Sequence, residues 1–278
     1  MHDEGLIDGI PTDAGWLGDR ALQYGDGLFE TIAVVDAQPC LWNLHMARLA
    51  EGCRRLALPL PDFELLARES RPLCAGRVRA VLKLYWTAGS SARGYRRPVP
   101  LIPRRMLRVS DWSDPGDAWR VRLCRHRLSE NPTLAQIKHL NRLDQVIARA
   151  EWDDPATAEG LMLDQAGRVV GGTSSNLFLQ QGDRLITPPI EGAGIAGVVR
   201  QLVLRLGERR GRPVQSSHVT PEQVRAADAL YLTNALIGVV RVGRFEQKLY
   251  PLDTPLHPLM HEARNLCHRP GWGGLGVE

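Results

Sequence analysis

Residues 136–141 read QIKHLN and place Lys138 between apolar neighbours, just before a segment of helical periodicity. The chain has only two other lysines, Lys83 and Lys248, so any chemistry that needs an amine has three candidates. Removing an ammonium group from water lowers its pKa, and the neutral amine can then attack a carbonyl carbon. Taken alone, the segment is also typical of a surface lysine whose stem packs on the protein, because lysine is rarely fully buried.

Four further segments carry groups that suit the binding of an anion. Residues 192–200 (GAGIAGVVR) lead into a predicted helix, whose first N–H groups can bind phosphate. Thr233 and Asn234 follow a predicted strand and could add a hydroxyl and an N–H group, although an ordinary strand-ending turn has the same residues. Arg48 lies in a predicted helix, where most arginines are solvated, but its fork can hold a phosphate. Arg93 lies in a glycine- and serine-rich loop, and such loops often carry binding residues.

Hydrophobic periodicity predicts an α+β fold with two domains, residues 1–113 and 114–278, joined through the polar segment 111–118 (DWSDPGDA). Predicted strands lie at 29–35, 77–87, 105–109, 119–125, 160–164, 168–179, 184–188, 229–233 and 239–242. Predicted helices span 62–73, 141–152 and 198–208, and a further helix lies near 255–267. Two more are predicted from their N-terminal caps, one after Asn43 and one after a capping box at 220–223. In the helix at 141–152, Leu143, Ile147 and Ala150 are spaced for one apolar face.

Composition excludes several classes of protein. No window of about 18 apolar residues predicts a membrane span, and the acidic start does not resemble a secretory signal, so we expect a cytoplasmic protein. Of the 35 basic residues, those other than the three lysines are arginines, and they are spread along the chain, which disfavours nucleic-acid binding. The five cysteines form no C-x-x-C pair, which predicts buried thiols and neither a disulfide framework nor a metal site.

In their order along the chain, these segments resemble the fold-type IV pyridoxal-phosphate enzymes, which include branched-chain aminotransferases, D-amino-acid aminotransferases and 4-amino-4-deoxychorismate lyases. The resemblance covers about residues 19–242 and rests on Lys138, 24–31 (YGDGLFET), 45–49 (HMARL), 175–178 (SNLF), 197–200 (GVVR) and 233–236 (TNAL). Each segment is weak evidence, but the ordered set is strong and favours a functional Lys138. Residues 138–143 (KHLNRL), with the loop at 93–95, are most similar to the lyases.

The resemblance implies a two-domain architecture like that of D-amino-acid aminotransferase, with the active site at the domain interface and a homodimer as the working form. It implies pyridoxal 5'-phosphate held as a Schiff base on Lys138, which would also move protons. The cofactor phosphate would be bound by Arg48, Val198, Val199, Thr233 and Asn234. The substrate side would be formed by Tyr24, Phe29 and Arg93, the last binding a carboxylate.

The implied reaction converts 4-amino-4-deoxychorismate to 4-aminobenzoate and pyruvate, a step in folate precursor synthesis. Two alternatives stay open. The chain is an aminotransferase for D- or branched-chain amino acids, or it is a protein that binds pyridoxal phosphate without catalysis. The retention of Lys138 in a chain with so few lysines disfavours the second alternative.

The sequence departs from the family pattern at Gly171. Family members usually carry a glutamate five residues before the asparagine of the 175–178 segment, where it pairs with the pyridine nitrogen of the cofactor. Glycine supplies no carboxylate, so the cofactor ring would accept electrons less readily. A different acid could substitute, a lyase could tolerate the weaker ring because aromatisation drives its reaction, or the protein could bind the cofactor without efficient catalysis. We favour the second explanation as a hypothesis.

Overall fold

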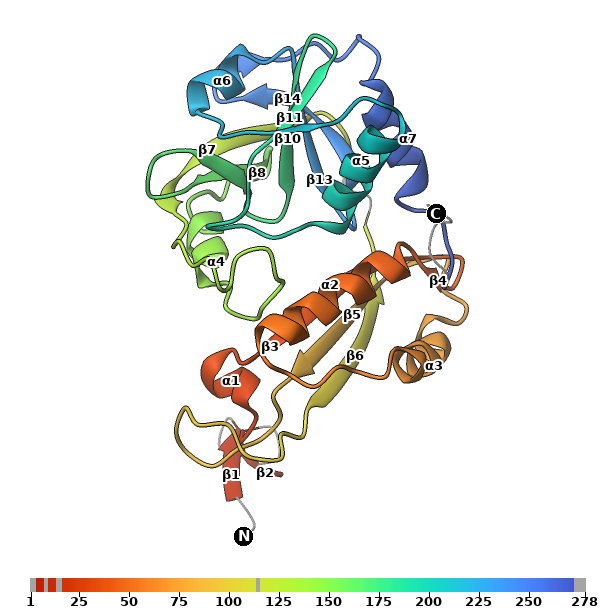
Figure 1. The fold of residues 1–278 in the computed structure, drawn as a ribbon, viewed down its shortest axis with the longest axis vertical. Helices are drawn as coiled ribbons and strands as arrows, with labels where there is room; N and C mark the ends of the chain where they lie inside the picture. Colours follow the sequence, from red (N-terminus) through yellow and green to blue (C-terminus); the bar gives the residue numbers. More distant parts are fainter. Residues whose placement is uncertain (1–3, 8–9, 14–16, 114–115, 273–278) are drawn as a thin grey trace.

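The computed structural model describes residues 4–7, 10–13, 17–113 and 116–272, and places them in two lobes that lie against each other (Figure 1). Each lobe is built around one sheet. A hairpin of β1 (Glu4–Ile7) and β2 (Ile10–Asp13) and the short helix α1 (Arg20–Tyr24) precede the first sheet. The element order therefore confirms the α+β class expected from the sequence.

The first lobe is a four-stranded antiparallel sheet in the order β4-β3-β5-β6. Its strands are β3 (Gly27–Val35), β4 (Gln38–Pro39), β5 (Arg79–Thr87) and β6 (Arg104–Asp111). Alternate residues of β5 are buried from Ala80 to Trp86, as the period of two predicts. They pack with buried residues of β3 under the helices α2 (Trp42–Arg55) and α3 (Phe63–Cys74).

Helix α2 begins two residues earlier than the sequence predicts, so the assignment of Asn43 as its cap is wrong. Leu41 takes the N-cap position with a φ of 54°, and its side chain packs in the core of the second lobe. Burial of Leu41 therefore outweighs the capping preference of Asn43. Helix α3 follows the expected rule, since the Asp62 carboxylate accepts a hydrogen bond from the Leu65 N–H at 3.0 Å.

The second lobe contains a larger mixed sheet in the order β12-β11-β10-β13-β14-β7-β8-β9, with β15 paired to β14. Its strands are β7 (Trp119–Arg127), β8 (Thr157–Leu163), β9 (Val169–Gly172), β10 (Asn176–Gln181), β11 (Arg184–Thr187), β12 (Gln215–Ser216), β13 (Ala229–Asn234), β14 (Gly238–Phe245) and β15 (Lys248–Leu249). Its helices are α4 (Leu143–Arg149), α5 (Val198–Arg209), α6 (Pro221–Ala226) and α7 (Pro258–Leu266). The strand predicted at 168–179 is thus two strands with a turn between them.

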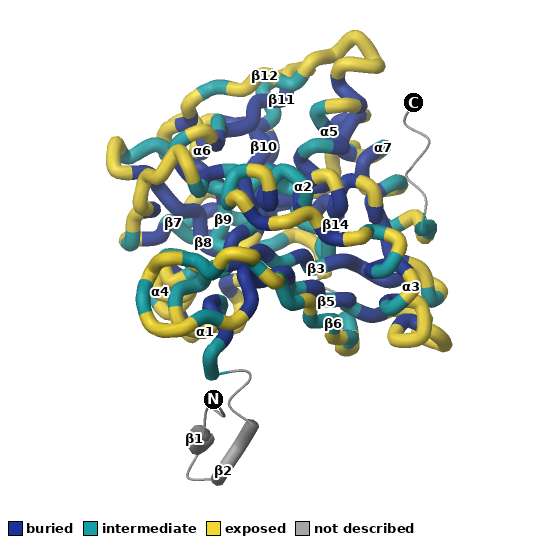
Figure 2. The backbone as a smooth tube through the Cα atoms, turned by 60° about the horizontal axis from the view of Figure 1, so that its bottom comes forward, coloured by how far each residue is buried: buried dark blue, intermediate teal, exposed yellow. Residues whose placement is uncertain are grey.

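Helix α4 is shorter than predicted, and its predicted apolar face is not buried within the chain. Leu143 is 73% exposed and Ile147 is 50% exposed, whereas Ala148 on another face is fully buried. The helix starts late because residues 138–140 are extended and paired with the start of β3. Figure 2 shows buried backbone running through both sheets, with α4 at the surface.

The two lobes exchange core residues. Ile137 lies just before Lys138 yet packs in the core of the first lobe, while Leu44 of α2 packs in the core of the second. Near its C-terminal end the chain packs against the first lobe again, where the rings of Trp272 and Trp42 lie edge to face with their centroids 5.3 Å apart. The two sheets separate between β6 and β7, and the boundary at 113/114 stays a prediction; residues 114–115 lie outside the described part.

Two predictions about buried and membrane-spanning residues can be compared with the structure. All five cysteines are buried and unpaired, as expected for small core residues. Among the described helices, none combines the length and apolarity that crossing a membrane would require.

Candidate active site

A cavity of about 500 Å³ opens between the two lobes, and Lys138 lines it. Its wall is formed by the first-lobe sheet and α2, the segment before α4, the turn between β9 and β10, the start of α5 and the end of β13. Of the residues predicted for the site, the lining includes Phe29, Arg48, Lys138, Val198 and Asn234. Tertiary structure thus brings together segments that are far apart in the sequence.

Lys138 is held by backbone pairing with β3. The Phe29 N–H donates to the Lys138 carbonyl and the Leu140 N–H donates to the Gly27 carbonyl, each at 3.0 Å. This pairing aims the amine into the cavity, with Nζ 4.3 Å from the centroid of the Phe29 ring. Removal from bulk water, reinforced by the positive charge of Arg48, lowers the pKa of Lys138 to about 7. The interpretation of Lys138 as a surface lysine is therefore wrong.

Arg48 points into the cavity from α2 while anchored behind it. Its Nε donates to Glu30 Oε1 at 2.9 Å, its Nη2 also binds Glu30, and its Nη1 donates to the Ala196 carbonyl at 3.1 Å. Burial alone would raise the pKa of Glu30, but Arg48 and His45 lower it to about 2. Arginine has five N–H groups, so Arg48 keeps donors for a phosphate while its orientation is fixed.

The start of α5 and the end of β13 add further donors to the same end of the cavity. Val198 lines the cavity, whereas Val199 is buried behind it. The first N–H groups of a helix have no partner within the helix. Asn234 Oδ1 accepts from two backbone N–H groups at 2.8 Å, which fixes the turn after β13. The Thr233 hydroxyl is buried, and no hydrogen-bond partner for it exists among the described residues.

The model of the family described as amino-transferase class IV matches residues 27–245. The chain belongs to this family. The aminodeoxychorismate lyase of Vibrio harveyi is 31% identical to it over 91% of this chain and 95% of that protein. The solved 4-amino-4-deoxychorismate lyase from Pseudomonas aeruginosa is 40% identical, with a TM-score of 0.82, and the match covers 94% of this chain and 96% of that one. The branched-chain aminotransferase of Escherichia coli, 19% identical with a TM-score of 0.79 over 92% and 90% of the two chains, shares the fold.

Membership of the class IV family confirms pyridoxal phosphate as the cofactor, and the cavity fits that molecule. Lys138 supplies an amine that is partly neutral near pH 7. The Thr233 hydroxyl, next in sequence to the lining residue Asn234, is buried without a hydrogen-bond partner in the described part of the chain. A phosphate would satisfy such a group, because a buried hydroxyl without a hydrogen bond is costly. The roles of Arg48, Val198, Val199, Thr233 and Asn234 as phosphate ligands stay a prediction that this geometry favours.

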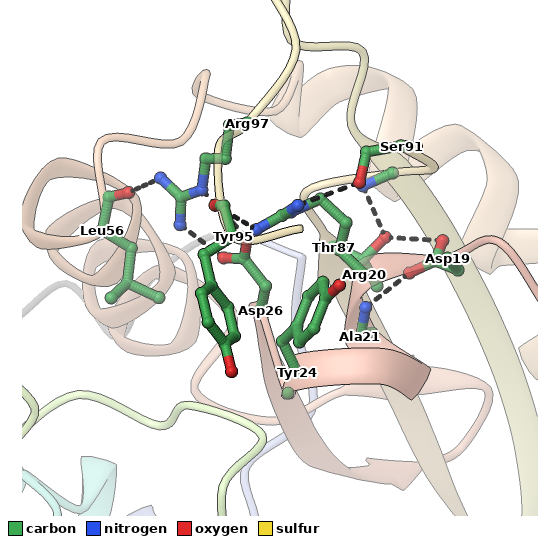
Figure 3. Close-up of polar contacts among 12 residues, drawn as sticks. Asp19, Arg20, Ala21, Tyr24, Asp26, Leu56, Thr87, Ser91, Tyr95 and Arg97 are labelled. Carbon is green, nitrogen blue, oxygen red and sulfur yellow. Dashed lines mark hydrogen bonds and ion pairs between the residues drawn. The ribbon is translucent and has the colours of Figure 1, made fainter. Parts of the chain in front are cut away.

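Two predicted substrate residues lie elsewhere in the same chain. The Tyr24 hydroxyl accepts a hydrogen bond from the Gly94 N–H at 3.2 Å, and Arg93 is exposed on that loop. Arg20 holds the loop by donating to the carbonyls of Gly94 and Tyr95 at 3.1 and 2.9 Å, and Figure 3 shows Arg20 beside Tyr24 and Tyr95. This network keeps Tyr24 and Arg93 out of the lining of their own chain's cavity, and their role in substrate binding stays a prediction.

Among the lining residues that sequence reasoning missed are Thr31, Arg142 and Gln145. Thr31 was detectable, because it follows Phe29 by two positions on β3 and must share its face. Arg142 and Gln145 gave no such signal, since their direction depends on where α4 begins.

Glu159 was also missed, and it organises the turn between β9 and β10. The residue is 1% exposed, and its carboxylate accepts hydrogen bonds from the backbone N–H and the hydroxyl of both Thr173 and Ser174, and from the Ser175 hydroxyl at 2.9 Å. A Cβ at Gly172 would lie 2.8 Å from this carboxyl group, so the close approach requires glycine. The turn held by Glu159 forms one wall of the cavity.

The low pKa of Lys138 predicts how the protein takes up its cofactor. Schiff-base formation needs the neutral amine, so its rate after addition of pyridoxal phosphate to cofactor-free protein should rise through about pH 7 and then level off. The measurement is the visible absorbance of the Schiff base followed by stopped flow, with Lys138→Ala as the control that forms none. A rate that keeps rising toward pH 10, as for an ordinary lysine, would contradict the assignment.

Glu159→Gln should destabilise the protein and loosen the cofactor. The amide nitrogen of glutamine cannot accept, which leaves buried donors of the 173–175 turn unsatisfied at a cost of about 1–3 kcal/mol each. Urea unfolding of the cofactor-free protein and titration with pyridoxal phosphate measure the two effects. The exposed Glu222→Gln is the matched control, and equal stability of the two variants would show that the turn does not depend on Glu159.

Proposed function

We propose that this chain is a pyridoxal-phosphate-dependent carbon–oxygen lyase that converts 4-amino-4-deoxychorismate to 4-aminobenzoate and pyruvate, for folate precursor synthesis. The observation that carries the proposal is the charge of the Lys138 cavity. Basic side chains line it, namely Lys138, Arg48, Arg142 and Arg149, and no described lining residue is acidic. Such a wall suits a cofactor phosphate together with a substrate that bears two carboxylates. The relatives named above as lyases support the same reaction.

The chain's own residues can perform the proton transfers of this reaction. Lys138 Nζ lies beside the apolar Phe29 ring, and its pKa of about 7 lets it both accept and donate a proton near neutral pH. It would take the proton from the carbon that bears nitrogen and return a proton to the departing three-carbon group. When bound, pyridoxal phosphate supplies a ring that accepts the electrons of the broken bond. Arg48, fixed by Glu30, would hold the phosphate while this proton moves.

An aminotransferase is the second candidate, since the D-alanine aminotransferase of Bacillus licheniformis is 24% identical over 85% of this chain. The absence of an acidic side chain from the described lining disfavours it. Glu159 lies behind the wall, but its oxygens are occupied by the donors of the 173–175 turn, so it is not free to replace a glutamate at position 171. This supports the explanation that the lyase tolerates a cofactor ring that accepts electrons less readily, over the explanation that another acid replaces the missing glutamate.

The proposal includes a homodimer in the cytoplasm. Helix α4 supports the dimer because its apolar side chains Leu143, Val146 and Ile147 are 50–73% exposed at the edge of the cavity. A second copy of the chain would cover this face and bring its own loops toward the cavity. The exposed loop with Arg93 is a candidate for such a contribution.

The lyase reaction is tested with enzymatically generated aminodeoxychorismate, measuring 4-aminobenzoate and pyruvate together. The wild-type protein should release the two products in equal amounts. Lys138→Ala should lower the rate by at least about 10²–10⁴-fold, because it removes the acid–base group as well as the amine. No product from a yellow, borohydride-reducible wild-type protein would refute the lyase and direct attention to amino-acid donors.

Gly171→Glu should raise any side transamination more than the lyase rate, because it supplies the missing carboxylate. A Cβ at position 171 would lie 2.8 Å from the Ser175 carbonyl oxygen, so any side chain there also shifts the turn. Gly171→Ala is therefore the matched control that reports the steric effect alone. Rates of both reactions are measured for each variant. An unchanged ratio between Gly171→Glu and Gly171→Ala would count against tolerance of a weaker ring.

Ile147→Asp should convert the dimer to monomers, because it places a charge in the apolar contact proposed for α4. Sedimentation velocity of the cofactor-bound protein measures the change. Leu249→Asp puts the same charge on an exposed apolar residue of β15, outside α4, and should leave the dimer intact. A wild-type monomer, or a dimer that survives Ile147→Asp, would refute this placement of the interface.

A further inference from the structure

Arg142 occupies the wall between two cavities. It is the last residue before α4 and lines both the Lys138 cavity and an adjoining cavity of about 280 Å³. The smaller cavity has a mixed lining, with polar residues such as Ser129 and Asn131, leucines such as Leu134, and the carboxylate of Asp144. A guanidinium at this position faces any molecule that spans the two spaces.

The guanidinium of Arg142 is held in place only by neutral acceptors. Its Nε donates to the His139 carbonyl at 3.0 Å and its Nη2 donates to the His139 ring nitrogen Nε2. Burial lowers the pKa of His139 to about 4, so the ring is neutral and can accept this bond. His139 therefore orients the fork without compensating its charge.

No carboxylate pairs with Arg142 among the described residues, which distinguishes it from Arg48 and its partner Glu30. The nearest acidic contribution comes from Asp144, whose oxygens already bind His126 at 2.9 Å and the Ser129 N–H at 3.1 Å. Burial lowers the pKa of Arg142 to about 10 because its charge is poorly compensated. The Nη1 group has no partner in the described part of the chain, so the cavity presents a fixed cation with a free donor.

We propose that Arg142 binds the carboxylate of the three-carbon enol ether group that leaves as pyruvate. This rests on the proposed function and adds to it the residue that selects a substrate with a second carboxylate. In that substrate the ether is attached next to the carbon that bears the amine, on which Lys138 acts. Arg142 follows Lys138 by four residues in the same segment and lines the same cavity. The exposed Arg93 has neither position.

The test is binding of two substrate analogues to the cofactor-bound protein, measured by calorimetry. One is 3-(carboxymethoxy)benzoate, which has a ring carboxylate and an ether-linked carboxylate, and the other is 3-methoxybenzoate, which lacks the second carboxylate. Wild-type protein should prefer the dicarboxylate by about 10- to 100-fold, the value of a hydrogen-bonded ion pair. Arg142→Gln should abolish the preference, and Arg142→Lys should retain part of it, because lysine keeps the charge without the fork.

Arg125→Gln is the matched control, because it removes a positive charge from an exposed arginine outside both cavities. It should keep the full preference. An unchanged visible spectrum of each variant shows that the Lys138 site is intact. A wild-type protein without preference, an Arg142→Gln variant that retains it, or equal weakening of both analogues would overturn the assignment. Since binding is read without turnover, an active lyase with any of these results would separate failure of this inference from failure of the proposed function.

Discussion

The structure depends on one short extended segment that is hydrogen-bonded to both lobes at once. Gln136 pairs with the stretch that leads into α5, through bonds of its N–H to the Gly194 carbonyl and of its carbonyl to the Ala196 N–H, at 2.8 and 2.9 Å. Two residues later, Lys138 pairs with the start of β3. Ile137, between them, is buried in the first-lobe core. The position of the lysine between the lobes is thus fixed by backbone hydrogen bonds, which do not depend on its side chain.

The charged side chains around this segment form two groups: buried carboxylates that have hydrogen-bond partners, and cations that face the cavity. The buried carboxylate of Glu30 is hydrogen-bonded to Arg48 and His45. The carboxylate of Glu159 is stabilised by N–H and O–H donors of the 173–175 turn. These groups lie behind the wall and give it shape, because a buried charge is stable only with partners. Lys138 and Arg142 face the cavity and lack acidic partners there. The protein therefore satisfies its structural charges internally and leaves its cavity positive, which is the complement of an anionic cofactor and substrate.

Glycine at positions 171 and 172 belongs to the same arrangement. The turn that Glu159 draws inward passes so close that a Cβ at either position would meet the Ser175 carbonyl oxygen or the Glu159 carboxyl at 2.8 Å. The departure from the family pattern at Gly171 thus coincides with a local packing constraint. The backbone path of this turn therefore leaves little room for any side chain at position 171.

The sequence alone determined the family and the two-lobed α+β class, because these depend on local periodicity and on motifs in a fixed order. It also singled out Lys138, which the structure places in the lining of the cavity. It also predicted Phe29, Arg48, Val198 and Asn234, which follow directly from those motifs. It misjudged Asn43 and the apolar face of α4, because burial of Leu41 and the extended path of residues 138–140 are decided by contacts with distant segments. Only the tertiary structure placed Glu159 behind the 173–175 turn. It also placed Arg142 in the lining of the Lys138 cavity, without a carboxylate partner among the described residues. Direction and partnership of a side chain depend on the three-dimensional path of the backbone, which local sequence does not specify.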